Sequence, residues 1–250
     1  MKLTYSIYYP GGNTTALVNQ LILDPALKKK INDQIMSLNP LVEQVGFVSQ
    51  RSNRLEMAGG EFCGNATRCA AFYYLKGRPG KIKINVSGVR QKLSAGIDQK
   101  NNCWAQIPVK KLVKKQKYSV VILEGITQVI TNGKATQNKA KAILKKLNLL
   151  NAVPAAGVMF IQKSTGQIKL NPFVWVRDIK TFFNETACAS GTAAVGVFLA
   201  NKSNQSVNLP ILQPSGEKLQ VLVKYISRSL FQVTISNPIK LVKENLYDSI

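Results

Sequence analysis

The chain has 250 residues, of which 45% are apolar and 8% aromatic, so it can bury a full core and intrinsic disorder is excluded. It contains no His, which excludes the Ser-His-Asp triad, the Cys-His dyad and His-containing zinc sites. Acid–base chemistry must therefore use Cys, Asp, Glu, Lys or Tyr.

The net charge is strongly positive, because 34 Lys and Arg residues oppose 12 Asp and Glu residues, which gives +22. This sign suggests an anionic partner such as nucleic acid, or a Lys-rich solvated surface. The densest basic cluster, Lys110 to Lys117, resembles a linker or an exposed face and lacks the interleaved aromatic residues that nucleic-acid readers use. A basic nucleic-acid-binding protein is kept as the second alternative function, and nucleic acid is not the expected partner.

The cysteine pattern and the N-terminal residues indicate the cellular setting. The four Cys residues form no CxxC pair, so we expect no metal site, and they are too few for a disulfide scaffold of this length. Residues 1–13 lack a secretion signal, and no apolar run approaches the ~20 residues of a membrane span. We expect a cytoplasmic protein with reduced thiols and no membrane association.

In the first half of the chain, the pattern predicts strands, two helices and a glycine-rich segment. The predicted strands cover residues 1–10, 16–18, 43–49, 81–86 and 89–95, and the predicted helices cover residues 25–36 and 70–75. Turns are expected at Gly11-Gly12-Asn13 and at Ser87-Gly88. The segment MAGGEFCGNATRC, residues 57–69, places Cys63 directly before the second helix.

In the second half of the chain, the pattern predicts the same order of strands, helices and turns. The predicted strands cover residues 120–123, 127–130, 158–162, 167–170, 173–176 and 219–223. An amphipathic helix is expected over residues 136–150, with lysines opposite its apolar stripe. The segment NETACASGTAA, residues 184–194, places Cys188 before an apolar helix over residues 193–200, and a Ser215-Gly216 turn follows.

The two halves match in the order of their features. Cys188 follows Cys63 by 125 residues, and Ser215 follows Ser87 by 128 residues. We interpret this as an internal duplication that gives two similar lobes. A helix that is apolar on all sides must be buried, so each lobe should wrap a sheet around its own central helix.

Cys63 and Cys188 should each lie at the N-terminal end of a helix, where unpaired N–H groups and the helix dipole favour negative charge. A thiol in this position is expected to have a lowered pKa. The backbone N–H groups that follow would bind an anion such as a carboxylate, and the residues concerned are Gly64, Asn65, Ala189, Ser190 and Gly191. Cys69 and Cys103 have no counterparts and are interpreted as structural.

If the two helix ends face each other, a substrate α-carbon between them has a thiolate on one side and a thiol on the other. One sulfur takes the α-proton and the other delivers a proton to the opposite face, which inverts the stereocentre without a cofactor. Dehydration of the site and dipoles aimed at the carboxylate would lower the barrier to this carbanion-like state.

Six motifs carry a resemblance to the diaminopimelate epimerase family of cofactor-independent amino-acid racemases, closest to its histidine racemase branch, which is associated with nicotianamine-like metallophore synthesis. The motifs are YPGGNTT (9–15), EQVGF (43–47), GEFCGNAT (60–67), CASGTA (188–193), VGVF (195–198) and QPSG (213–216). They span nearly the whole chain, and the two Cys motifs are specific only in combination.

The resemblance implies an α+β fold with two pseudo-symmetric lobes, each a curved, mostly antiparallel sheet around a central helix. It implies a first lobe of residues 1–115 with the tail 240–250, a second lobe of residues 116–239, and a homodimer. Cys63 and Cys188 would be the proton donor and acceptor, with Gly64-Asn65 and Ala189-Ser190 at the substrate carboxylate. Asn13 and Gln44 would contact the substrate, and Glu43, Glu61 or Glu185 could pair with an ammonium or imidazole on it.

The sequence departs from diaminopimelate epimerases at two places. Their Glu-Arg-Gly segment before the second Cys is replaced by TFFNET (181–186), which lacks the Arg that helps to hold a distal carboxylate, and MAGG (57–60) replaces their Asn-Ala-Asp-Gly run. An unpaired distal carboxylate is costly. We therefore expect racemisation of L-histidine, with diaminopimelate or another basic or polar amino acid as the alternative.

Two relatives of similar fold are disfavoured by particular residues. Proline racemases have His near their Cys residues, and this chain has none. Phenazine-type isomerases have an acidic residue where this chain has Cys63.

Overall fold

Short strands and a few helices alternate along the residues that the computed structural model describes, which are 2–49, 51–228 and 230–249. The first part of the chain forms β1 (Lys2–Tyr9), β2 (Thr15–Val18), α1 (Pro25–Leu38), β3 (Gln44–Ser49), β4 (Arg54–Met57), α2 (Gly64–Leu75), β5 (Gly80–Val86), β6 (Leu93–Ile97) and β7 (Asn102–Ile107). The second part forms β8 (Val109–Lys115), β9 (Tyr118–Leu123), β10 (Thr127–Asn132), α3 (Gln137–Lys146), α4 (Leu149–Ala152), β11 (Ala155–Ser164), β12 (Gln167–Val176), β13 (Thr181–Asn184), α5 (Ala189–Ser203), β14 (Val207–Leu212), β15 (Lys218–Ser227), β16 (Leu230–Pro238) and β17 (Lys240–Ser249).

The strands pair in two sets with the same order of pairings. The first lobe is the series β17-β1-β2-β3-β4-β5-β6-β7, and the second lobe is the series β8-β9-β10-β11-β12-β14-β15-β16. In both series the successive pairings are antiparallel, antiparallel, parallel, antiparallel, parallel, antiparallel and antiparallel. The predicted α+β fold of two pseudo-symmetric lobes is therefore confirmed.

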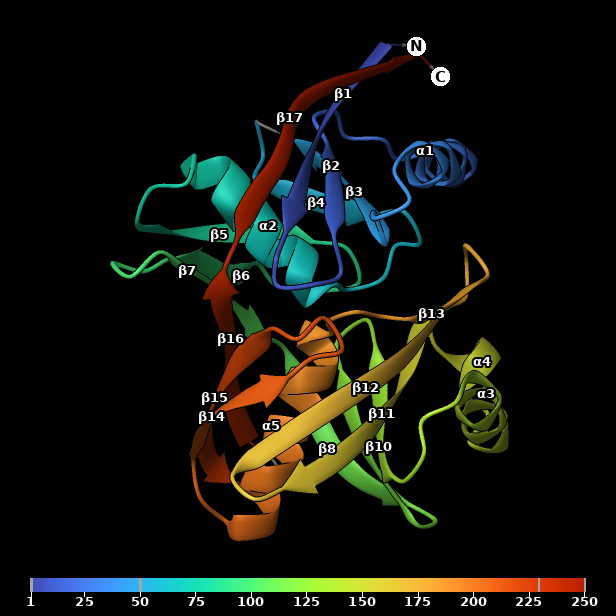
Figure 1. The fold of residues 1–250 in the computed structure, drawn as a ribbon, viewed down its shortest axis with the longest axis vertical. Coiled ribbons are helices and arrows are strands. Elements are labelled where there is room, and N and C mark those ends of the chain that lie inside the picture. The colour runs from blue at the N-terminus through green and yellow to red at the C-terminus, as the bar shows by residue number, and fades with distance from the viewer. Residues whose placement is uncertain (1, 50, 229, 250) are drawn as a thin grey trace.

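Each lobe encloses one helix, α2 in the first lobe and α5 in the second (Figure 1). Small residues let the strands approach α5 closely: a Cβ on Gly196 would lie 2.7 Å from Val221 Cγ2. Because α5 carries small and apolar residues on all sides, burial in the sheet is its only stable environment. Within the described part of the chain, no helix is long and apolar enough to span a bilayer.

Two strand crossings connect the lobes. β7 leads out of the first lobe and β16 leads back, and the two pair antiparallel from Asn102–Pro238 to Ile107–Val233. β17 then lies along β1, so the two ends of the chain are neighbours (Figure 1). The domain division at residue 115 stays a prediction. Strand β8 ends at this residue and is hydrogen-bonded to β9 of the second lobe.

Three local predictions differ from the structure. The helix predicted over residues 136–150 is interrupted, because Asn148 adopts a left-handed conformation (φ 54°) between α3 and α4. No strand was predicted at seven places, which are β4, β7, β8, β13, β14, β16 and β17. The basic cluster from Lys110 to Lys117, expected as a linker or exposed face, largely forms β8, where Leu112 and Val113 contact the core and the lysines are exposed.

Candidate active site

The two cysteines begin the two central helices. Cys63 is the N-cap of α2, and its Sγ accepts a hydrogen bond from the Ala66 N–H (3.4 Å). Cys188 is the N-cap of α5, and its Sγ accepts from the Gly191 N–H (3.3 Å). Each sulfur thus does what a Ser or Asp side chain does at other N-caps, because it satisfies one of the free N–H groups of the first turn.

The N-terminal ends of α2 and α5 meet across the lobe boundary. A Cβ on Gly64 would lie 3.0 Å from Ala189 Cβ and 2.9 Å from Ile107 Cδ1, so only glycine fits this contact without displacement. A cavity of about 30 Å³ lies at the junction. The predicted site residues that line it are Gln44, Cys63, Gly64, Asn65, Cys188, Ala189 and Ser190.

Amide side chains hold the two thiols and their helices. The Cys63 thiol donates to Gln44 Oε1 (3.0 Å), and Gln44 Nε2 donates to Thr15 Oγ1 (2.7 Å). The Cys188 backbone N–H donates to Gln213 Oε1 (3.0 Å). Both amide side chains are therefore fixed from a second side, since Gln213 also donates to Ile211 O (3.0 Å).

Ser190 is the closest hydroxyl to the Cys188 sulfur, at 3.5 Å. Its Oγ accepts a hydrogen bond from Gln128 Nε2 (2.8 Å), and Gln128 is fully buried. Gln128 was missed by the sequence reasoning, since nothing in its surrounding strand sequence marks it. Gln213 lies in a motif that the resemblance had already identified, but no role was assigned to it.

Three predicted contact residues do not line the thiol cavity. Asn13 donates its backbone N–H to Thr186 Oγ1 (2.7 Å). Glu43 accepts from the Thr186 N–H (3.0 Å) and from the Thr186 hydroxyl, and it lines a second cavity beside the first. The Gly191 N–H is occupied by the Cys188 sulfur. In this ligand-free structure, Asn13 and Glu43 therefore join the first lobe to the segment before Cys188.

Two further carboxyl groups lie at the thiols. Glu61 and Glu185 line both cavities. Glu61 is 7% exposed, and its Oε2 has no hydrogen-bond partner. Burial raises the pKa of Glu61 to about 7. Burial also raises the pKa of Glu185 to about 8; a hydrogen bond with Cys188 opposes this shift, and the Glu43 carboxylate adds to it.

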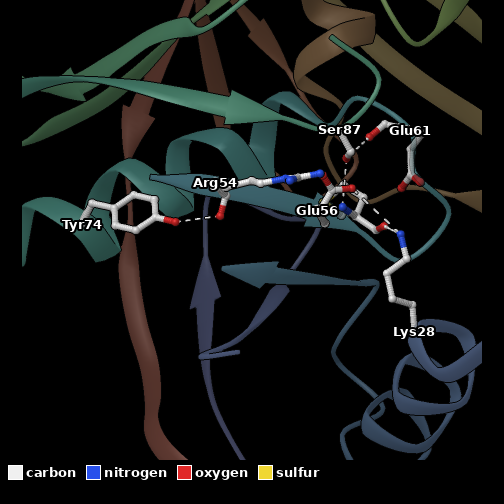
Figure 2. A network of polar contacts seen from close by, with 7 residues as sticks. Lys28, Arg54, Glu56, Glu61, Tyr74 and Ser87 are labelled. Carbon is white, nitrogen blue, oxygen red and sulfur yellow. Dashed lines mark hydrogen bonds and ion pairs between the residues drawn. The ribbon is translucent and has the colours of Figure 1, made fainter. Parts of the chain in front are cut away.

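The segment that carries Glu61 is held from behind by a polar network (Figure 2). Ser87 Oγ donates to the Glu61 carbonyl (2.7 Å) and accepts from the Met57 N–H (2.9 Å). Lys28 reaches from α1 to the Met57 carbonyl (3.3 Å) and lies 4.0 Å from Glu56, which also pairs with Arg54 (2.8 Å). These contacts fix the backbone of residues 57–61 and leave the Glu61 carboxyl facing the cavities.

The predicted lowering of the thiol pKa values is wrong in this structure. Burial, followed by the Glu185 carboxylate, raises the pKa of Cys63 to about 12, against the opposing Ala66 N–H. The same two causes raise the pKa of Cys188 well above its usual value. One helix N–H is outweighed by desolvation and a nearby negative charge, so both thiols are protonated at neutral pH.

The described residues contain no cluster of three or more Cys, Asp or Glu side chains arranged to hold a metal ion. The four cysteines are free thiols.

Glu61→Gln should change how stability depends on pH. Because burial raises the pKa of Glu61 from 4.5 to about 7, the unfolded chain releases this proton at lower pH than the folded chain. The free energy of unfolding therefore falls as pH rises through this window. Relative to wild type, Glu61→Gln should gain stability between about pH 4.5 and 8, by at most about 3 kcal/mol.

Thermal unfolding of both proteins across this pH range measures the difference. Glu124→Gln is the matched control, because Glu124 lies outside both cavities and faces Lys110 at 3.9 Å. A Glu61→Gln difference that is the same at every pH would contradict the assignment.

Comparison with known proteins finds histidine racemases that are similar to this chain over most of its length. Histidine racemase from Fusobacterium nucleatum is 28% identical over 257 aligned residues, covering 94% of this chain and 93% of the relative. Histidine racemase from Staphylococcus aureus is 27% identical over 241 residues, covering 87% of both chains.

Solved structures share the fold. The Bacillus anthracis phenazine biosynthesis protein of the PhzF family matches all of this chain with a TM-score of 0.68 at 12% identity. A hydroxyproline epimerase from Agrobacterium vitis matches 99% of this chain and 93% of its own, with a TM-score of 0.63 at 10% identity. Residues 2–246 match the family described as the histidine racemase CntK N-terminal domain, so the chain belongs to this family and is an isomerase of the racemase type.

Proposed function

We propose that the protein interconverts the L and D forms of a free amino acid by using Cys63 and Cys188 as a thiol–thiolate pair, without an organic cofactor. The observation that carries the proposal is that these two N-cap thiols, one from each pseudo-symmetric lobe, line one cavity. A reaction whose substrate and product are mirror images needs an acid and a base of similar strength on opposite sides of the α-carbon.

The proton balance closes without another reactant. In one direction the thiolate of one cysteine takes the α-proton, and the C–H electrons remain on the substrate as a carbanion conjugated with its carboxylate. The thiol of the other cysteine then gives its proton to the opposite face. The two cysteines have exchanged protonation states, which are restored either by a turnover in the reverse direction or by proton exchange with solvent.

The substrate carboxylate would bind between the helix ends. The N–H groups of Gly64, Asn65, Ala189 and Ser190 take part in no hydrogen bond within the described residues. Such N–H groups at helix N-termini favour an anion, and their attraction grows as the carboxylate gains charge in the transition state. The contact at Gly64 keeps these two sets of donors close enough to share one carboxylate.

The lining of the two cavities favours a cationic side chain. It includes Glu43, Glu61 and Glu185 and no Lys or Arg. A distal carboxylate, as in diaminopimelate, would find no basic partner there and would oppose ionisation of these Glu side chains, which is unfavourable. Together with the name of the relatives, this supports L-histidine as the first substrate to test, with other basic or polar amino acids next.

Substrate binding would also activate the thiols. A cation beside Glu185 would cancel part of the negative charge that helps to raise the pKa values of Cys63 and Cys188. Deprotonation of one thiol would then become easier when substrate is present than in the empty site. In the empty site, the protonated thiols would be protected from alkylation and oxidation.

The cavity must open to admit a substrate. Its volume of about 30 Å³ holds little more than one or two water molecules, which is far less than an amino acid requires. Because the cavity lies between the lobes, we infer that they separate for binding and close again around the substrate.

The resemblance also supports a homodimer, a cytoplasmic location and a role in metallophore synthesis, and we propose all three as expectations of the family. Light scattering coupled to size-exclusion chromatography tests the dimer directly.

The central test combines a substrate panel with thiol variants. Each L-amino acid is incubated in heavy water, and the product is analysed by chiral chromatography and mass spectrometry. We expect L-histidine to yield D-histidine labelled at the α-carbon. Cys63→Ala and Cys188→Ala should each lower turnover by about 1,000-fold or more, because each removes an obligatory proton carrier.

Cys103→Ala is the control, since this buried thiol lies outside the cavity and should leave turnover near the wild-type value. Near-normal activity of both cavity variants would contradict the two-thiol mechanism, and no labelled product from any amino acid would contradict the proposed function.

Glu185→Gln should make the empty-site thiols more reactive. Removing the carboxylate removes the second-largest cause that raises the pKa of Cys63, so this pKa should fall. Alkylation of Cys63 by iodoacetamide, followed by mass spectrometry from pH 7 to 10, should therefore begin at lower pH than in wild type. Glu124→Gln should leave the profile unchanged. A profile identical in wild type and Glu185→Gln would show that Glu185 does not control the thiol.

A further inference from the structure

Arg68 is a buried cation that the mechanism above does not use. It lies on α2, one turn after Gly64, and its side chain is fully buried. An Arg guanidinium stays charged in proteins. None of the ion pairs in the part of the chain that the structure describes involves Arg68. A buried charge without a carboxylate partner is costly, so its position calls for an explanation.

The guanidinium bonds to three separate segments of the chain. Nη2 donates to the Pro10 carbonyl (2.8 Å) and to Asn65 Oδ1 (2.8 Å), and Nη1 donates to the Asn237 carbonyl (3.3 Å). Pro10 follows β1, Asn65 is in the first turn of α2, and Asn237 lies near the end of β16, where the chain returns to the first lobe. The planar fork of Arg can hold these three acceptors together.

Two of these three segments also form hydrogen bonds with residues of the second lobe. Asn65 donates through Nδ2 to the Ala187 carbonyl (3.0 Å), one residue before Cys188. The Arg68–Asn65–Ala187 series of hydrogen bonds therefore runs from the helix of one thiol to the backbone of the other.

The loop after Pro10 makes the second connection. The Gly11 carbonyl accepts from Ser215 Oγ (2.8 Å), and the Asn13 N–H donates to Thr186 Oγ1 (2.7 Å). A side chain cannot be added at Gly12 without meeting Ala187 Cβ at 2.9 Å. The segment before Cys188 is thus hydrogen-bonded both to Asn65 and to the loop after Pro10. Arg68 bonds to Asn65 and to the Pro10 carbonyl, so it contacts both of these elements.

We propose that Arg68 is a positioning residue that locks the first turn of α2 and the loop after β1 onto residues 186–188, and thereby sets the position of Cys188 relative to Cys63. Its consequence for turnover rests on the two-thiol function proposed above. Its consequence for structure does not, because the lock would hold the two segments together whatever the reaction.

Arg68→Lys tests the lock first by hydrogen exchange. Lys keeps the charge but cannot hold three acceptors in the geometry of the guanidinium. We expect amide exchange in residues 11–13 and 186–191 to rise by about tenfold or more, while α3, far from Arg68, keeps its protection. Arg78→Lys, an exposed arginine just after the same helix, is the control and should change neither segment. Unchanged exchange in Arg68→Lys would overturn the proposal, with or without racemase activity.

Asn65→Ala provides a second variant if Arg68→Lys does not fold. It leaves the guanidinium bonded to Pro10 and Asn237 and removes both its bond to Asn65 and the bond from Asn65 to Ala187, so exchange in residues 186–191 should again rise. Unchanged exchange in this variant would overturn the Arg68–Asn65–Ala187 connection.

Kinetics with the best substrate in heavy water then tests the positioning role. In Arg68→Lys, kcat should fall by about 100-fold, because a displacement of the order of 1 Å between reacting groups has this effect, whereas KM should change much less. With Cys188 displaced, the carbanion would live longer, and the thiol that took its proton would more often exchange with heavy water and then deliver deuterium back to the original face. The deuterium content of recovered substrate, relative to product, should therefore rise above the wild-type ratio.

A merely structural role would reduce the amount of folded enzyme and leave that ratio unchanged, which would overturn the positioning role. If wild-type protein racemises no amino acid, the proposed function fails, and the exchange experiment still decides whether Arg68 forms the lock.

Discussion

The contact between the first turns of α2 and α5 is the constraint on which the site depends. Gly64 and Ala189 bring the two helix ends together so closely that no larger side chain fits at Gly64. This contact places two N-cap sulfurs and four free backbone N–H groups around one small cavity. The small residues of the two Cys motifs therefore serve close approach as well as anion binding. The same closeness leaves room for little water, and the loss of hydration keeps the thiols protonated.

The sheet explains why such a symmetrical site exists. Both lobes use one order of parallel and antiparallel pairings, so both central helices leave their sheets in equivalent positions. The equivalence is broken in the side chains around the thiols. Cys63 has Gln44 as its neighbour, whereas Cys188 has Ser190 and Glu185. The backbone thus places two thiols in equivalent positions, and the side chains around them differ.

Much of the architecture could be predicted from the sequence, because apolar helices, Ser-Gly turns and the two Cys motifs recur with nearly constant spacing. Seven strands escaped prediction, among them β8, which is rich in lysine and is a strand because it pairs with β9. In the site, local pattern identified the residues next to the cysteines. It could not identify Gln128 or Arg68, whose roles arise from contacts with residues 62 and 169 positions away. The thiol pKa values were also predicted wrongly, because burial and Glu185 are properties of the folded site.

The paired crossings β7 and β16 have a mechanical consequence. Two separate linkers would allow the lobes to tumble independently, but two strands joined by a continuous antiparallel ladder form a ribbon, which bends readily across its face and resists shear along its length. Opening about such a ribbon confines the lobes to a narrow range of paths. In the mechanism proposed above, each closure would then return the sulfurs to the same separation, and the geometry of inversion would be reproduced from one catalytic cycle to the next.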